Sequence, residues 1–258
     1  MKYDLPLFLE LNAEYLAKPI QRKPARSNKP ADAMDLARRR LAVVGGEKLN
    51  GLRLLEIGCG RGELCKSAGR MFRCEVVGVD VESYGNSWDG APPNARLLRR
   101  DLGAGDNSDL GQFDRAMSFS VFEHVHHPYT MLKAVFDLLK PGGQFYLMVN
   151  LYRGPQASHR YREVKFPWPH ILFQDDVFED FYRSIGKPPL RAAWVNQLSV
   201  SDYFTYFKLI GFEAGTPSYS TEPIDEPFYK RFEDILGRFP RWDLEKNFLK
   251  LTLTKPLS

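Results

Sequence analysis

The chain has 258 residues, of which 43% are hydrophobic and 13% aromatic, enough to bury the core of one large domain. No apolar run reaches the roughly 20 residues that span a bilayer, and the N-terminus lacks the layout of a secretory signal, so we expect a cytoplasmic protein without a membrane span. The formal net charge of +4 arises entirely within residues 1–50, which hold ten Lys and Arg against six Asp and Glu, so nucleic acid is not the expected partner of the rest of the chain.

The N-terminal charge is concentrated in one segment. Five basic residues but no acid lie from Lys18 to Lys29, and Pro19, Pro24 and Pro30 are interleaved with them. This composition predicts an extended, solvated segment. Contact with a polyanion such as RNA is the alternative, although the segment has no aromatic side chain on which bases could stack.

From residue 31 onward, helical and strand patterns alternate. Apolar residues recur at helical spacing over 31–44. Five short apolar strands follow, interleaved with helices at 63–71 and 130–139, and the second helix is ended by a turn over 140–143. The expected strands are 52–58, 74–80, 95–101, 113–120 and 144–150. Short buried strands that alternate with helices predict right-handed crossovers and a doubly wound parallel sheet.

The second half of the chain interrupts this alternation. Residues 151–198 are rich in prolines, aromatics and histidines, which predicts a lid rather than another strand-helix repeat. The elements expected after it are a helix over 200–212, a strand near 212–219, a helix near 226–236 and a terminal strand over 247–256.

A glycine-rich turn joins the first strand to its helix. The sequence Glu56-Ile57-Gly58-Cys59-Gly60-Arg61-Gly62 allows a tight turn and a close backbone approach by a ligand, which would face the positive end of the next helix. The dinucleotide fingerprint G-x-G-x-x-G would need glycine at the position of Glu63, so the pattern disfavours a dehydrogenase.

Two further strands end in acids. Asp80 follows VVGV, and Asp101 follows RLLRR. Because ligands of open α/β sheets bind at the carboxyl ends of the strands, these carboxylates are placed to accept the hydroxyls of a ribose. The alternative for each acid is a helix cap.

These motifs carry a family resemblance. LLEIGCGRG, VVGVD, RRDL, FDRAMSFSVFEHV and LLKPGGQFYLMV resemble, in order and spacing, the motifs of class I (Rossmann-like) S-adenosylmethionine-dependent methyltransferases. The resemblance covers about residues 50–150, with weaker similarity over 199–213 and 247–256. It implies a methyltransferase with a doubly wound α/β fold: a seven-stranded, mostly parallel sheet with an antiparallel C-terminal strand and a lid inserted after the fifth strand.

The resemblance also implies where S-adenosylmethionine binds. The residues expected to hold it are Glu56, Gly58, Cys59, Gly60, Asp80, Val81, Asp101, Leu102, Ser118 and Phe119. The loop residues would lie beside the methionine end, Asp80 would accept the ribose hydroxyls, and Asp101 the adenine amino group. The last two residues would flank the methionine portion. The three cysteines, at 59, 65 and 74, form neither a disulfide framework nor a zinc motif and are expected to be reduced.

Transfer of a methyl group to oxygen also requires removal of a proton, for which histidine is the usual base near neutral pH. The five histidines lie between residues 124 and 170. His124 and His159 are the candidate catalytic bases, although His124 could serve structure and His159 could be a surface residue. A metal site that combines Glu123 with the neighbouring histidines is the weaker alternative, and we expect no metal.

The acceptor is less well defined. The Asn/Asp-Pro-Pro-aromatic motif of nucleobase methyltransferases is replaced here by SFSVFEH, so we expect a small-molecule or glycan acceptor, methylated at a hydroxyl. The candidate substrate-binding residues are Arg160, Tyr161, Trp168 and His170, in a segment that forms either an aromatic wall or a hydrophobic plug. The alternatives are an RNA-directed enzyme that uses the basic arm and a non-catalytic module that binds the cofactor.

We therefore expect residues 1–50 to form a basic arm and a helix that cover the active site. Residues 51–258 would form the methyltransferase domain, with lid insertions at about 151–198 and 220–246. The sequence does not predict the oligomeric state.

Overall fold

The computed structural model describes residues 3–18 and 30–257, so most of the expected basic segment lies outside the described residues. The chain divides into two compact units. The sheet unit comprises Arg26–Val149, Ser201–Ser218 and Leu249–Ser258, and the helical unit comprises Met1–Ala25, Asn150–Val200 and Tyr219–Phe248. Of the described residues in the N-terminal part, 1–50, residues 3–18 belong to the helical unit and 30–50 to the sheet unit.

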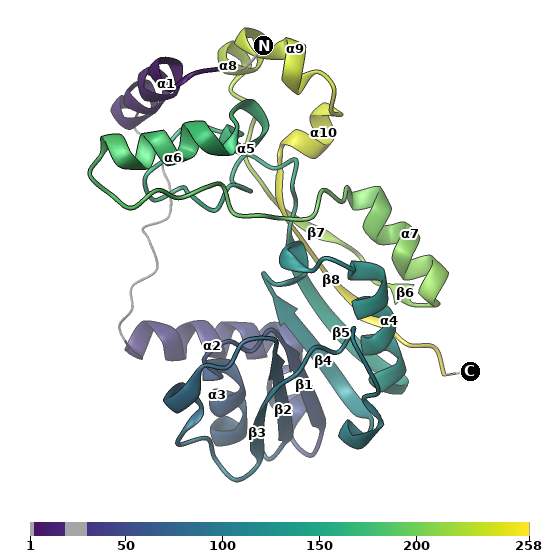
Figure 1. Ribbon diagram of the computed structural model, residues 1–258. Coiled ribbons are helices and arrows are strands. Elements are labelled where there is room, and N and C mark those ends of the chain that lie inside the picture. The colour runs from purple at the N-terminus through teal and green to yellow at the C-terminus, as the bar shows by residue number, and fades with distance from the viewer. Residues whose placement is uncertain (1–2, 19–29, 258) are drawn as a thin grey trace. The chain divides into compact units, whose positions relative to one another are not determined.

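The described strands form one sheet in the order β3-β2-β1-β4-β5-β8-β6, with β7 paired to β8 (Figure 1). Their bounds are β1 Arg53–Ile57, β2 Glu75–Asp80, β3 Ala95–Arg99, β4 Phe113–Phe119, β5 Leu139–Asn150, β6 Glu213–Ala214, β7 Ser218–Thr221 and β8 Lys246–Thr254. Strands β3 to β5 pair in parallel through β2, β1 and β4, whereas β6 and β8 are antiparallel. The doubly wound, mostly parallel fold is confirmed. The described residues hold eight strands rather than seven, because the strand expected near 212–219 is split into β6 and β7.

Helices cover both faces of the sheet, because alternate residues of each strand point to opposite sides. Helices α2 (Pro30–Val44) and α3 (Glu63–Met71) share one apolar core with β1, β2 and β4. On the other face, α4 (Pro128–Leu138) and α7 (Val200–Ile210) meet through Tyr129 and Tyr206, whose ring centroids lie 5.5 Å apart (Figure 1). Short 3₁₀ helices lie at Gly46–Leu49, Gly85–Trp88, Ser108–Leu110 and Phe122–His124.

Strand β5 begins earlier than the sequence predicts. The turn expected over 140–143 is instead an irregular part of β5, where the register with β4 shifts between the pairs Phe113↔Leu139 and Arg115↔Gln144. Gly142 has φ +74°, and its N–H donates to the carbonyl of Lys255 at 2.9 Å. A long-range partner thus converts a local turn signal into a bulged strand.

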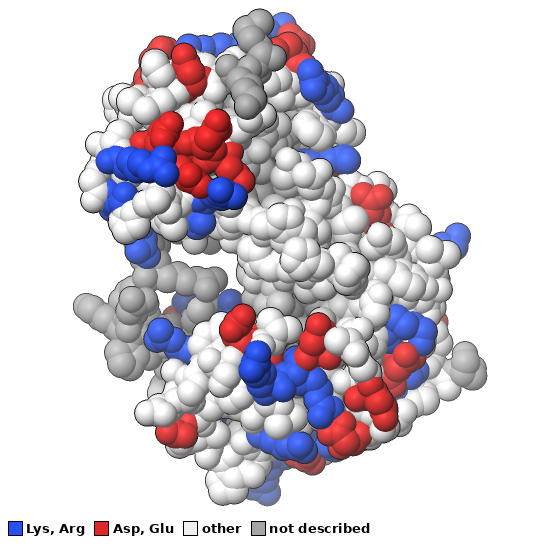
Figure 2. All heavy atoms as spheres, viewed as in Figure 1, with Lys and Arg blue, Asp and Glu red and all other residues white. Residues whose placement is uncertain are grey.

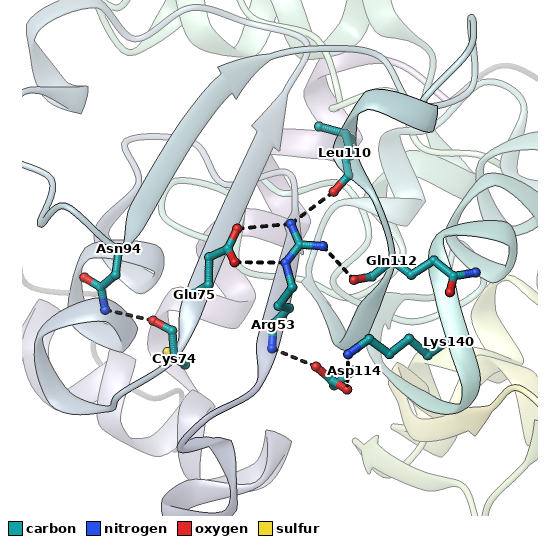
Figure 3. Close-up of polar contacts among 8 residues, drawn as sticks. All are labelled: Arg53, Cys74, Glu75, Asn94, Leu110, Gln112, Asp114 and Lys140. Atoms are coloured by element: carbon teal, nitrogen blue, oxygen red, sulfur yellow. Dashed lines mark hydrogen bonds and ion pairs between the residues drawn. The ribbon is translucent and has the colours of Figure 1, made fainter.

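An ion-pair network joins the amino ends of the central strands (Figure 3). The Arg53 guanidinium donates to both carboxylate oxygens of Glu75 at 3.0 Å, and these bonds lower the pKa of the Glu75 carboxyl. Asp114 accepts the backbone N–H of Arg53 at 2.8 Å and the Lys140 ammonium at 2.7 Å. Bidentate geometry makes such contacts more specific than a single surface ion pair. The network ties β1, β2, β4 and β5 together at their amino ends.

The helical unit is built from short helices around an aromatic core. The helices are α1 Leu5–Ala17, α5 Pro169–Leu172, α6 Asp175–Ser184, α8 Glu226–Arg231, α9 Glu233–Leu236 and α10 Arg241–Leu244. Helix α1 begins where the Asp4 carboxylate accepts the N–H of Leu7, and it packs on α6 (Figure 1). Phe8 is fully buried, with four rings around it at centroid distances of 4.7 to 5.3 Å, those of Phe166, Phe173, Phe178 and Phe181.

The helix expected near 226–236 is divided into α8 and α9, which meet at Phe232. Among the helices of the described residues, none combines the length and the apolar character that crossing a membrane requires.

Replacing Phe8 by alanine should reduce the stability of the helical unit by about 3–5 kcal/mol, because it removes a buried ring and leaves a cavity among four others. Urea unfolding followed by circular dichroism measures the loss. Leu9→Ala is the matched control, since Leu9 lies in the same helix but is 39% exposed, and it should cost less than about 1 kcal/mol. Equal losses for the two variants would show that Phe8 does not hold the core together.

Candidate active site

The sheet unit contains a cavity of about 600 Å³ at the carboxyl ends of its central strands. Six residues that the sequence nominated line it: Gly58, Asp80, Val81, Asp101, Leu102 and His124. They come from four separate segments, which the parallel pairing of β1 with β2 and β4, and of β2 with β3, brings to one edge. The predicted convergence of the glycine turn with the two acids is therefore present in the fold.

The glycine turn is fixed by its contacts with β2. The N–H groups of Gly58 and Cys59 both donate to the Val79 carbonyl, at 2.8 and 3.0 Å. Gly58 has φ +72°, and a Cβ atom there would lie 2.3 Å from Cγ2 of Val121, which lines the cavity. Since any larger residue would collide with the cavity wall, glycine is required at this position.

Asp80 supports the turn and also faces the cavity. One carboxylate oxygen accepts the N–H of Gly60 at 2.8 Å, and the other accepts the N–H of Glu82 at 3.0 Å. Each oxygen retains a further lone pair. Asp80 can therefore accept hydroxyl groups from a ligand without releasing the loop.

The residue that follows each acid is apolar and lines the cavity. Val81 is 52% exposed, and Leu102 is buried at 2%. Asp101 is exposed, and one of its oxygens accepts the N–H of Gly103 at 2.8 Å. Two apolar side chains in a cavity that also contains two carboxylates suit a flat, partly polar ring.

Four other nominated residues lie outside the cavity lining, in or behind the glycine turn: Glu56, Cys59, Ser118 and Phe119. Ser118 is fully buried, and its hydroxyl donates to the Ile57 carbonyl at 3.2 Å. Phe119 lies under the guanidinium of Arg40, 4.6 Å from the ring centroid. Gly60, the remaining nominated residue of the turn, also lies outside the lining, and its carbonyl accepts the indole N–H of Trp88 at 2.7 Å. These contacts indicate that the nominated residues outside the lining support the cavity wall from behind.

Glu56 is a buried acid beneath the turn. It is 4% exposed, and its carboxylate accepts the Cys65 thiol at 2.9 Å. Burial raises the pKa of Glu56 to about 7, although the Cys65 hydrogen bond and the charge of Arg40 act in the opposite direction. The carboxyl can therefore exchange a proton near neutral pH.

The three cysteines are free and buried. Burial raises the pKa of the Cys59 thiol, and the nearby charges of Glu56 and Asp80 raise it further. A protonated, buried thiol is a poor nucleophile and a poor metal ligand. Cys59 thus serves the turn as a small side chain.

The helical unit holds the remaining candidates. His159 has φ +54°, and its Nε2 lies 3.2 Å from Oδ1 of Asn150. The Arg160 guanidinium donates to the Arg191 carbonyl at 2.6 Å, and Tyr161 is 51% exposed. These three side chains are at least partly accessible in a loop that follows β5.

Of the expected substrate-binding residues, Trp168 is committed to the interior and His170 is half-buried. Trp168 is only 1% exposed, and its indole N–H donates to the carbonyls of Arg153 and Leu244. His170 donates to the Tyr152 carbonyl at 2.6 Å, and burial lowers its pKa to about 4. Of the two interpretations of this segment, a wall for the acceptor or a hydrophobic plug, the packing of Trp168 supports the plug.

Several cavity residues were missed by the sequence analysis. They include Tyr84, Ser120, Val121, His126, His127 and Met131. Ser120 follows the nominated pair at the end of β4 and has φ +59°, so the chain turns there toward the cavity. The position of Ser120 directly after β4 is a signal in the sequence that could have identified it as a cavity residue. Met131 reaches the cavity from α4, which only the tertiary fold reveals.

The titration of Glu56 predicts a pH-dependent stability. Because its pKa rises from 4.5 to about 7 on folding, the folded protein binds more protons than the unfolded chain between these pH values. The free energy of unfolding should therefore fall as pH rises through this interval, by on the order of 3 kcal/mol. Urea unfolding at several pH values measures the slope, which Glu56→Gln should flatten. Glu63→Gln, at an exposed acid of α3, should retain it, and an unchanged slope in Glu56→Gln would contradict the assignment.

Comparison with known proteins identifies the family. A family model described as a methyltransferase domain matches residues 10–184. The ubiquinone biosynthesis O-methyltransferase of Ruegeria pomeroyi is 40% identical over 162 residues, which cover 54% of this chain and 61% of that protein. The chain thus spans about three fifths of the length of this curated relative.

Solved structures share the fold at low sequence identity. An S-adenosylmethionine-dependent methyltransferase from Mesorhizobium loti aligns with a TM-score of 0.56 and 20% identity, over 83% of this chain and 95% of that one. The [4+2]-cyclase SpnF aligns with a TM-score of 0.54 and 14% identity, over 98% and 93%. With the motifs and the family match, this fold shows that the chain belongs to the class I S-adenosylmethionine-dependent methyltransferases, enzymes whose cofactor is S-adenosylmethionine.

Proposed function

We propose that this protein transfers a methyl group from S-adenosylmethionine to a hydroxyl of a small-molecule acceptor. The observation that carries the proposal is one cavity lined by Gly58 of the glycine turn together with Asp80 and Asp101. The choice of oxygen is supported by the Ruegeria pomeroyi relative, which is an O-methyltransferase. A glycan hydroxyl meets the same chemical requirement and belongs in the panel of acceptors to be assayed.

The cavity fits the chemistry of this cofactor. The free lone pairs of Asp80 suit the two ribose hydroxyls, and the apolar side chains of Val81 and Leu102 suit adenine. Asp101 would accept the adenine amino group. The turn at Gly58 and Gly60 leads into α3, whose N-terminus favours a carboxylate. We assign the methionine end of the cofactor to this turn, above the buried Glu56.

S-adenosylmethionine, when bound, would supply a methyl group on a positively charged sulfur for in-line displacement by the acceptor oxygen. The protein's own part is to align the acceptor and to remove its proton. His124 lines the cavity, and His159 lies in the loop after β5. We propose that one of these two imidazoles takes the proton.

The surface charge supports a small acceptor over RNA. Figure 2 shows acidic and basic side chains intermixed where α6 lies in Figure 1. In this region Glu179 pairs with Arg183 and Arg191, and Glu163 pairs with Lys187. Mixed charges of this kind attract a polyanion less than a continuous basic face does.

Replacing Asp80 by asparagine should weaken binding of the cofactor product, S-adenosylhomocysteine, by about 10- to 100-fold, because a charged acceptor of hydroxyl hydrogen bonds is lost. Isothermal titration calorimetry on the full chain measures the change. Asp89→Asn is the control, since Asp89 is exposed and does not line the cavity, and its affinity should equal that of the wild type. The assignment fails if the wild type gives no binding heat, or if Asp80→Asn binds as tightly as the wild type.

The base is tested by His124→Ala and His159→Ala, assayed with labelled S-adenosylmethionine over a range of pH. Loss of a general base should lower kcat by about 10²- to 10⁴-fold, so one variant should show that loss. Product affinity measured on both variants separates a lost base from lost cofactor binding. Full turnover and an unchanged pH profile in both variants would reject a histidine base.

A further inference from the structure

We propose that Asn150 is a positioning residue that holds His159 with its proton on Nε2, so that the basic lone pair lies on Nδ1. The consequence for catalysis rests on the proposed function, in which His159 is one of the two candidate bases. The hydrogen-bond arrangement itself lies within the helical unit and does not depend on that role.

The orientation of the Asn150 amide follows from its partners. Asn150 is the last residue of β5 and is 3% exposed. Its Nδ2 donates to the backbone carbonyl of Asn247 at 2.7 Å. A carbonyl can only accept a hydrogen bond, so the amide NH₂ must face Asn247, and Oδ1 is left facing His159.

The same reasoning fixes the imidazole. Nε2 of His159 lies 3.2 Å from Oδ1 of Asn150, and an amide oxygen has no proton to donate. Nε2 must therefore carry the hydrogen, and in the neutral ring the lone pair belongs to Nδ1. In catalytic triads a carboxylate holds the imidazole through Nδ1–H and leaves the lone pair on Nε2, so the two nitrogens have exchanged roles here. A neutral amide orients the ring without adding a charge to the site.

The backbone around His159 is held in an unusual conformation. Its φ of +54° is in the left-handed region, which costs a non-glycine residue about 1–2 kcal/mol. The loop is held by the His159 N–H, which donates to Gln156 at 3.2 Å, and by the Ala193 N–H, which donates to Ser158 at 3.0 Å. Strain that neighbouring contacts maintain is typical of residues with a functional role.

Asn247 links the loop to the Asn150 amide. Its side-chain oxygen accepts the backbone N–H of Gln156 at 3.0 Å, while its backbone carbonyl accepts from Asn150. Glu222 accepts from the side chains of both Gln156 and Asn247, at 2.7 and 3.2 Å. One strand residue thus positions the loop that carries His159 and also the amide that orients its ring.

The test is nuclear magnetic resonance of the full chain with ¹⁵N-labelled histidine, in which His159→Gln identifies the His159 signals. We expect a hydrogen-bonded Nε2–H and an unprotonated Nδ1 in the wild type. In Asn150→Leu the Nε2–H signal should be lost to exchange with water. Asn150→Asp should retain it, because a carboxylate still accepts from Nε2–H although it gives up the bond to Asn247. His170, whose Nε2–H donates to Tyr152, is the internal control and should be unchanged.

Kinetics provide the second measurement. Asn150→Leu should lower kcat by about 10- to 100-fold, because an imidazole that is no longer held in place is less often aligned with the acceptor. The affinity for S-adenosylhomocysteine should stay constant. Asn150→Asp should recover most of that loss. A wild-type proton on Nδ1, or an Nε2–H signal that persists in Asn150→Leu, would overturn the proposal. Wild-type turnover by His159→Ala would instead refute the base role of His159 and leave the spectra unaffected.

Discussion

The hydrogen bond between the Gly60 N–H and the Asp80 carboxylate connects the structure of the sheet to its chemistry. It ties the turn after β1 to the end of β2, beside the two N–H groups that donate to the Val79 carbonyl. Strands β1 and β2 pair in parallel up to Ile57 and Val79. The glycine turn and Asp80, which follow these two residues, therefore lie next to each other at the carboxyl end of the sheet. The cavity exists because these two strand ends are locked together, and the Arg53 network holds their opposite ends.

Function and stability oppose each other beneath this turn. Glu56 is buried without a full ionic partner, and burial raises its pKa to about 7. A well-packed apolar residue would cost less there, since isolated buried charges are unfavourable. Under the proposed function, this acid lies beneath the turn that we assign to the methionine end of the cofactor. Arg40, stacked on Phe119, offsets part of that cost.

The stability of the helical unit depends on its aromatic core. The unit is assembled from three separate chain segments and short helices, which are marginal in isolation. The aromatic core around Phe8 supplies the packing that the helices lack individually, and Trp168 belongs to that core. The loop at His159 is partly accessible, and it is bonded to Asn150 and Asn247. Trp168, in the aromatic core, therefore serves stability, and the catalytic role proposed for this unit falls to His159.

The sequence alone determined the alternation of strands and helices, the glycine turn, and the acids at 80 and 101, because periodicity, glycine and strand ends are local signals. It also determined the family. Tertiary structure decided what depends on distant partners: the bulged start of β5, the burial of Trp168, and the approach of Met131 to the cavity. The Asn150 contact is of the same kind, since the carbonyl that orients its amide lies 97 residues away in the chain.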